Sequence, residues 1–436
     1  MAFSSVQFLF VFLPLSLAVY WLCPKWLRNA VLAAFSLLFF AWAGLKGAAI
    51  LVLLAGINWL GGLSLGRLAH KRPLLILLIL LDLAVLGGFK YAGFAAETVN
   101  ALVPGLLPVL SPALPLGLSF YVFTAIGYCA DVAAGKVESE KNPIRFAVFL
   151  AFFGHGPSGP IVRYGQQAPQ LDPGSETRRV SADRFCYGIK RLVLGLAKKA
   201  IIADQLALIY AKVASVPAAT LPAPILVLGY TAYMMQLYFD FSGYSDMAIG
   251  IGEFFGITLP ENFEYPYLAC SVGEYWRRWH ISLSSWFRDY VYIPLGGSRV
   301  AAKRRLYFNI FMVWLLTGIW HGAKWTYIVW GMMYFVLLCV ERILNLSGQK
   351  SWLGWIYTVF FFIAGNVVFR SENVTGALKY LLAMFNIHTT GLLDEKAVYY
   401  FAEYKMFLLI GMAAALPIAV WLRAQAGRRG AWIENL

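Results

Sequence analysis

The sequence predicts an all-α integral membrane protein, and three observations lead to that fold class. Hydrophobic residues make up 60% of the 436 residues and charged residues only 13%, whereas soluble domains are near ~45–50% apolar and ~25% charged. Long apolar stretches recur along the chain. The 36 basic residues outnumber the 22 acidic ones, which gives a net charge of +14. This composition excludes a disordered chain and an ordinary soluble domain.

The first apolar stretch, residues 6–22, is expected to be a membrane helix and not a cleavable signal peptide. No basic residue precedes it, and Lys25 and Arg28 follow it. Further stretches have the length and apolarity of spans. They are residues 29–43, 47–65, 74–89, 116–134, 200–216, 225–241, 307–320, 325–340, 352–369 and 406–422. The chain is therefore expected to have about eleven transmembrane helices, allowing ~17–25 residues for a full crossing and fewer for a partial one.

The basic residues indicate the orientation of these spans. Cytosolic loops of membrane proteins are rich in lysine and arginine, and the basic segments here alternate accordingly. They are residues 67–72, 136–145, 299–305, 342–350 and 423–429. The N-terminus is thus expected outside, the C-terminus in the cytosol, and the proline-rich stretch 104–115 outside. The net positive charge then fits contact with anionic lipid and gives no reason to expect a nucleic-acid partner.

Two segments do not fit simple crossings. Residues 146–162 are apolar but broken by glycine and proline, and basic loops flank both ends, so we expect a re-entrant loop; a surface loop is the alternative. Residues 177–199 predict a basic amphipathic helix that lies on the inner membrane surface.

No soluble domain boundary is visible, so residues 1–436 are expected to form one membrane domain, with the chemistry in about 236–331. The five cysteines are scattered without metal-ligand spacing.

His280 lies in an unusually aromatic segment. Residues 274–293 predict one helix, and at ~100° per residue Trp279 and His280 fall on the same side as Trp276, with Arg278 opposite. Such a helix suits a membrane interface or the rim of a cavity. A buried histidine bonded to a backbone carbonyl is the alternative.

His321 lies between two strongly apolar stretches, with Gly318 and Gly322 close by. An ionisable residue at such a place is a functional candidate because it is costly to bury. Burial would keep the ring neutral, and a neutral imidazole is a competent general base. The alternative is a histidine at the outer end of a hairpin turn.

The remaining motifs narrow the chemistry. The chain has no G-x-S-x-G elbow, no H-E-x-x-H metal motif and no P-loop. Transfer of an acyl group from a thioester to a hydroxyl needs none of these. Asp240 and Asp246 follow an apolar run and could orient a histidine or line a polar pocket, or they could lie in cytosolic water beyond a span.

Four stretches resemble a known family. They read DFSGYSDMAIGIG (240–252), LPENFEYPY (259–267), EYWRRWHISLSSWFRDYVYIPLGGSR (274–299) and GIWHGAKWTYIVWG (318–331). Together with FSSVQFLFVFLPL near the N-terminus and SGPIVRY at 158–164, they resemble the membrane-bound O-acyltransferase family, most of all its alginate-acetylating branch. Teichoic-acid D-alanyl transferases share part of this text. The likeness covers most of the chain.

The resemblance implies a fold and a set of site residues. The fold is a helical membrane body with re-entrant and interfacial helices around a thin central pore. The catalytic histidine of the family's WHG motif corresponds to His321, and the histidine of its WRRWH motif corresponds to His280. The residues expected to bind donor or substrate lie in the four matching stretches. They are Trp276, Arg277, Trp279, Arg288, Asp289, Asp240, Tyr244, Asn262 and Trp320.

The resemblance also implies a function. We expect a bacterial inner-membrane O-acetyltransferase that moves acetyl from a cytosolic thioester toward hydroxyls of an exported polysaccharide such as alginate, through a periplasmic partner protein or directly. The donor is expected to be acetyl-CoA, with an acyl-carrier donor as the alternative. No bound cofactor or metal is expected. Alternatives are another acceptor (cellulose or another exopolysaccharide), D-alanylation of teichoic acid, a polysaccharide transporter, or a haem protein with His280 and His321 as ligands. Relatives read FPQLVAGPIVRY where this chain reads FFGHGPSGPIVRY, so His155 is expected to be non-catalytic.

Overall fold

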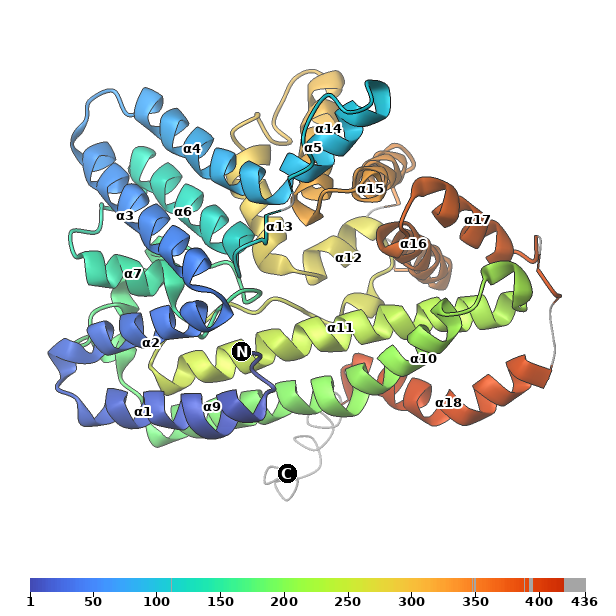
Figure 1. The fold of residues 1–436 in the computed structure, drawn as a ribbon, viewed down its shortest axis with the longest axis horizontal. Coiled ribbons are helices and arrows are strands. Elements are labelled where there is room, and N and C mark those ends of the chain that lie inside the picture. Colours follow the sequence, from blue (N-terminus) through green and yellow to red (C-terminus); the bar gives the residue numbers. More distant parts are fainter. Residues whose placement is uncertain (111, 347, 349, 388, 392–394, 419–436) are drawn as a thin grey trace. The chain divides into compact units, whose positions relative to one another are not determined.

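The computed structural model describes residues 1–418 except 111, 347, 349, 388 and 392–394. In that part of the chain the regular elements are helices, together with an isolated antiparallel bridge between Phe263 and Trp279 (Figure 1). The helices cluster into two compact units. Unit 1 comprises Met1–Leu196, Gly243–Asn262 and Ser282–Lys324, and unit 2 comprises Ala197–Ser242, Phe263–Ile281 and Trp325–Leu436. The expected single domain stays a prediction.

Unit 1 is built mainly from N-terminal helices. They are α1 (Leu13–Leu22), α2 (Arg28–Ala43), α3 (Leu45–Arg67), α4 (Arg72–Lys90), α5 (Ala92–Leu102), α6 (Leu118–Ala133), α7 (Pro143–Ala151), α8 (Tyr164–Gln167), α9 (Ala182–Ala197), α13 (Ile281–Phe287) and α14 (Lys303–His321). Helix α6 packs against both α3 and α4, and α2 packs against α7 (Figure 1). Phe8, Phe39 and Phe153 meet ring to ring in the core beneath α2.

Unit 2 contains the remaining helices. They are α10 (Asp204–Ala214), α12 (Val272–Arg278), α15 (Trp325–Ile343), α16 (Trp352–Arg370), α17 (Val374–Met384) and α18 (Glu395–Ala415). Helix α15 packs against α12 and α16, α16 packs against α17, and α10 packs against α18. Helix α11 (Ala223–Phe254) begins in unit 2 and ends in unit 1.

Every predicted span coincides with a helix, although 419–422 of the last span lie outside the described residues. Among the described residues, five helices are long and apolar enough to cross a membrane. They are Lys25–Ala43, Leu45–Arg67, Arg72–Lys90, Trp325–Ile343 and Trp352–Arg370. These confirm the predicted spans at 29–43, 47–65, 74–89, 325–340 and 352–369 as candidates. The apolar helices at Phe8–Leu22 and Leu118–Ala133 are shorter, and the total of about eleven stays a prediction.

The basic helix predicted at 177–199 begins later than expected. Helix α9 starts at Ala182, where the Ser181 hydroxyl accepts a hydrogen bond from the Arg184 amide at 3.1 Å, as an N-cap residue does. The chain before it is held in another conformation because Arg178 is buried and donates to Asn29 at 2.6 Å. At its other end α9 continues through a π-helical turn, Lys198–Ala203, directly into α10.

The span predicted at 225–241 is also part of a longer element. Helix α11 does not end near Asp240 but continues to Phe254. Its second half packs closely on α9 at glycines: a Cβ at Gly188 would lie 2.9 Å from the Gly250 carbonyl oxygen, and one at Gly195 would lie 2.7 Å from Met247 Cγ. Small residues at such contacts let two helices approach closely.

The broken segment 146–162 is enclosed by protein, so the alternative of a surface loop is wrong. Helix α7 ends at Ala151, and the turns that follow are buried, Phe152, Phe153 and Ile161 among them. The amide of Phe153 donates to the hydroxyl of Ser36 on α2 at 3.0 Å. Irregular backbone of this kind is tolerated at membrane depth only where protein or water covers it. The re-entrant placement stays a prediction.

A polar cluster links three apolar helices of unit 1. The Asn58 side chain on α3 donates to the Asp82 carboxyl on α4 at 2.9 Å, and the Cys129 thiol on α6 donates to the Asn58 amide oxygen at 3.3 Å. Asp82 and Asn58 are fully buried. Since a buried polar group without a partner costs free energy, this cluster fixes how α3, α4 and α6 pair.

Replacing Asn58 with alanine should therefore destabilise unit 1. Asn58→Ala leaves the Asp82 carboxyl without its amide partner, which costs about 1–3 kcal/mol. Thermal unfolding in nanodiscs should show a lower Tm. Ser64→Ala is the matched control, because the exposed Ser64 hydroxyl on α3 bonds within its own helix, to the Leu60 carbonyl. An unchanged Tm for Asn58→Ala would contradict the role of the cluster.

Candidate functional site

His321 is the last residue of α14. Gly322 follows in an extended conformation, and α15 begins at Trp325, so only three residues separate the two helices. Helix α14 has 19 residues, and the alternative of a histidine at a hairpin turn stays open. The ring of Trp320 packs at 4.9 Å from the His321 ring, and Phe120 of α6 packs against Trp320 at 5.6 Å. His321 itself is half-buried.

The turn that holds His321 is attached to α4. The Tyr91 hydroxyl donates to the carbonyl oxygen of Ile319, and the Lys90 ammonium donates to that of Trp320. Lys90 also lies 5.4 Å from the centre of the Trp320 ring and interacts electrostatically with His321. Neither residue was among the sequence candidates. Lys90 stands directly after a predicted span, where an ionisable residue is a signal, but the sequence does not indicate that it meets α14.

Trp320 is also linked to α13 through Phe123 of α6. Phe123 on α6 packs 5.8 Å from Trp320 and stacks at 3.9 Å on Trp286 of α13. The Trp286 indole N–H donates to the Phe123 carbonyl at 2.8 Å. Four aromatic side chains of unit 1 therefore pack in series next to His321. They are Phe120, Trp320, Phe123 and Trp286.

His280 does not lie within a helix, and the single helix predicted over 274–293 is wrong. Helix α12 ends at Arg278 and α13 begins at Ile281. His280 has φ of +46°, in the left-handed region that few residues other than glycine and asparagine adopt. The helix ends because its last residues pair with a neighbouring strand-like segment: Trp279 bridges Phe263, and the Glu264 amide donates to the Arg278 carbonyl.

The His280 side chain is buried, with its ring 4.7 Å from that of Phe241 on α11. Trp279 packs against Phe263 at 5.0 Å and stacks on Tyr275 at 5.6 Å. The alternative of a core histidine stays open.

Helix α12 is fixed at its start by an acid from α15. The buried Glu341 carboxylate accepts hydrogen bonds from the amides of Val272 and Gly273, which a helix N-terminus leaves without intrahelical partners. Trp276 packs edge-on against Tyr334 at 4.9 Å, whereas Arg277 is exposed. The structure therefore brings Trp276 and Trp279 into one aromatic layer and leaves Arg277 at its surface.

Arg288 and Asp289 lie in a π-helical turn, Arg288–Tyr292, after α13. The Arg288 guanidinium is exposed and donates to Asp289 at 2.8 Å, and Arg163 pairs with the other Asp289 oxygen at 3.3 Å. The Tyr290 hydroxyl donates to Asp131 on α6 at 2.7 Å. These bonds attach the turn to the rest of unit 1 and leave Arg288 available to solvent.

The α11 candidates point in different directions. Asp240 pairs with Lys199 at 2.9 Å and is partly exposed. Burial alone would lower the pKa of Lys199, but the carboxylates of Asp204 and Asp240 raise it. Tyr244 stacks on Phe3 at 4.7 Å near the N-terminus, and the buried Asp246 forms an ion pair with Arg191 of α9.

Asn262 is fully buried, and its side chain attaches the start of α13 to the segment that follows α11. Its side-chain oxygen accepts from the Ser282 amide at 3.1 Å and from the Ser282 hydroxyl at 2.9 Å. This is the bonding of a helix cap. The role of Asn262 in substrate binding stays a prediction.

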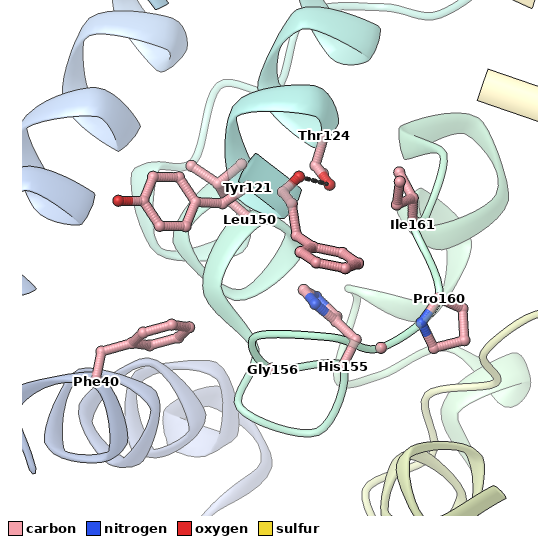
Figure 2. A pocket seen from close by; sticks show the side chains of 10 residues that line it. Phe40, Tyr121, Thr124, Leu150, His155, Gly156, Pro160 and Ile161 are labelled. Carbon is pink, nitrogen blue, oxygen red and sulfur yellow. Dashed lines mark hydrogen bonds between the residues drawn. The ribbon is translucent and has the colours of Figure 1, made fainter. Parts of the chain in front are cut away.

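His155 lines a small pocket in unit 1, between α6 and the turns after α7 (Figure 2). The pocket offers about 10 Å³ to a water-sized molecule, near the least that one water needs. The buried His155 ring bonds through Nε2 to the Phe149 carbonyl at 3.2 Å. That bond gives the His155 ring a partner inside the core. Its expected non-catalytic role stays a prediction.

The apolar helices make this chain a multi-pass membrane protein, and comparison with known proteins gives its family. Residues 118–378 match the membrane-bound O-acyltransferase family. The probable alginate O-acetylase of Azotobacter vinelandii is 40% identical over 397 residues, covering 88% of this chain and 78% of the relative. That of Pseudomonas putida is 41% identical over 400 residues, covering 88% and 80%. The chain belongs to the membrane-bound O-acyltransferase family and is an O-acyltransferase.

A more distant relative has a different acceptor in its name. The peptidoglycan O-acetyltransferase of Helicobacter pylori is 33% identical over 428 residues, covering 89% of this chain and 81% of the relative. The family assignment favours an enzyme over the transporter and haem-protein alternatives.

The left-handed backbone at His280 allows its side chain and its conformation to be tested separately. Asparagine adopts this region far more readily than alanine, for which it costs roughly 1–2 kcal/mol. His280→Asn should therefore unfold at a higher temperature than His280→Ala, while both variants lose the imidazole. Equal melting temperatures would contradict the positive φ as a constraint, and retained activity in His280→Asn would exclude a chemical role for the ring.

Proposed function

We propose that this O-acyltransferase moves an acetyl group from cytosolic acetyl-CoA toward hydroxyl groups of an exported polysaccharide, alginate. The acetyl group passes either directly to sugar or through a periplasmic partner protein. The support is the likeness to alginate O-acetylases over nearly nine-tenths of the chain.

In the proposed reaction His321 is the general base. Its neutral ring nitrogen removes the proton of the acceptor hydroxyl while the hydroxyl oxygen attacks the carbonyl carbon of the thioester. The tetrahedral intermediate collapses, the carbon–sulfur bond breaks, and the thiolate takes the proton back from the imidazolium. The products are the acetyl ester and free CoA, and the ring returns to its neutral form.

The observation that carries this assignment is the position of His321 at the end of α14. A helix end leaves the side chain without the i+3 and i+4 helical neighbours of a mid-helix residue, and Gly322 adds no side chain next to it. The packed rings of Trp320 and Phe120 support it from one side. A base held on a rigid helix end can be kept in the geometry that proton transfer needs.

The other candidates receive roles in donor binding. His280 is proposed to orient the thioester or stabilise its developing negative charge. The exposed guanidinium groups of Arg277 and Arg288 suit the phosphates of CoA, which arginine binds through paired N–H donors. The aromatic side chains, Trp276, Trp279 and Trp320, are proposed to line the donor's path.

The acceptor is the least constrained part of the proposal. The name of the Helicobacter pylori relative offers peptidoglycan as a second candidate acceptor. An acceptor panel of alginate, cellulose and peptidoglycan fragments separates these, and D-alanyl transfer is tested with a D-alanyl thioester donor.

His321→Ala should abolish acetyl transfer. Loss of a general base typically costs about 10²–10⁴-fold in rate, and the variant should keep its expression level and Tm. The measurement is release of free CoA and incorporation of labelled acetyl by protein in nanodiscs with polysaccharide present.

Two other histidines provide controls for this experiment. His70→Ala, at an exposed position, and His155→Gln, which keeps a donor for the Phe149 carbonyl, should retain activity. Wild-type turnover in His321→Ala would exclude the proposed base. No turnover by wild type with any acceptor would exclude acetyl-CoA as the donor.

We also propose about eleven spans with the N-terminus outside and the C-terminus in the cytosol. Val109→Cys, at an exposed position in the proline-rich stretch, should then react on intact spheroplasts with a membrane-impermeant maleimide. The native Cys186 on α9 is exposed as well, and it should react only after the membrane is opened. The reverse labelling pattern would overturn the orientation.

A further inference from the structure

The final turn of α14 has an unusual pair of donors. The last four carbonyl groups of an α-helix have no intrahelical partner. Two of them in α14, those of Ile319 and Trp320, accept bonds from Tyr91 and Lys90, which are adjacent in sequence at the end of α4. Two consecutive side chains thus hold two consecutive carbonyls, directly before His321.

Burying the charged ammonium of Lys90 costs free energy unless it has partners. Its ammonium is mostly enclosed, and among the described residues no carboxylate pairs with it. Its partners are the Trp320 carbonyl, the Ser119 hydroxyl at 3.2 Å and the face of the Trp320 ring. A cation at a helix C-terminus complements the partial negative charge of the helix dipole. The C-terminal end of α14 therefore stabilises the positive charge of Lys90, which its apolar surroundings would destabilise.

We propose that Lys90 and Tyr91 are positioning residues that fix the final turn of α14 and thereby the His321 ring. This inference rests on the proposed function, in which His321 is the base. Because the Trp320 ring packs on both Lys90 and His321, a shift of the turn moves the histidine. Misplacing a catalytic group by about 1 Å costs on the order of 100-fold in rate.

The test compares Lys90→Met, Lys90→Arg and Tyr91→Phe with wild type in nanodiscs. Lys90→Met removes the donor and its charge, and should lower kcat about ten- to hundredfold with KM for acetyl-CoA unchanged. Lys90→Arg keeps both and should recover most of the loss. Tyr91→Phe removes one neutral hydrogen bond and should lower kcat about two- to tenfold. Lys136→Met is the control, because Lys136 pairs with Asp131 at 3.3 Å and is largely exposed.

Hydrogen–deuterium exchange of a peptide covering residues 316–323 gives a readout that does not depend on activity. Exchange should be faster in Lys90→Met and Tyr91→Phe than in wild type, and unchanged in Lys136→Met. Unchanged exchange in both variants would overturn the proposal. Faster exchange with normal kcat would mean that the pair only caps the helix. A raised KM for acetyl-CoA at normal kcat would mean that Lys90 binds the donor. Either result overturns the positioning role.

Failure of the proposed function gives a different pattern. If wild type consumes no acetyl-CoA, the donor assignment fails while the exchange comparison still decides whether Lys90 and Tyr91 hold the turn. Faster exchange in both variants then shows that the pair holds the turn, and unchanged exchange overturns the inference.

Discussion

Backbone amides and carbonyls within a lipid bilayer have no water to bond with, so each must find a partner inside the protein. A continuous helix meets this requirement by itself, but every interruption has to be covered by side chains from elsewhere. Two interruptions in unit 1 are covered in this way. The Ser36 hydroxyl accepts from the amide of Phe153 after α7, and Lys90 donates to the carbonyl of Trp320 at the end of α14.

The same requirement applies at the two motif histidines. His321 ends a helix and His280 occupies a left-handed residue between two helices, so both sit at interruptions of the helical backbone. An interruption leaves backbone N–H and C=O groups without the partners that a continuous helix supplies. Side chains from other helices bond these groups, as the Glu341 carboxylate does at the start of α12. The same bonds hold the interruption in place.

Much of the fold could be predicted from the sequence because apolar length is a direct requirement of the bilayer. The helices at 47–65 and 74–89 were predictable to within a few residues for this reason. The breaks were not, since they depend on contacts between distant segments. The pairing of Trp279 with Phe263 ends α12, and the burial of Arg178 delays α9. His321 was found from its apolar surroundings and its motif, whereas Lys90 became visible only through its contact with α14.

The π-helical turns have a consequence for how this chain can change. Each of Phe8–Phe12, Lys198–Ala203 and Arg288–Tyr292 widens the helix by one residue per turn relative to an α-helix. Such a turn holds an extra residue over the same rotation, so removing one residue there would restore a regular α-helical turn and leave the following helix facing the same neighbours. A one-residue deletion elsewhere in these helices would rotate everything beyond it by about 100° and present the wrong face. The three π-helical segments are therefore the places where these helices can lose a residue without repacking.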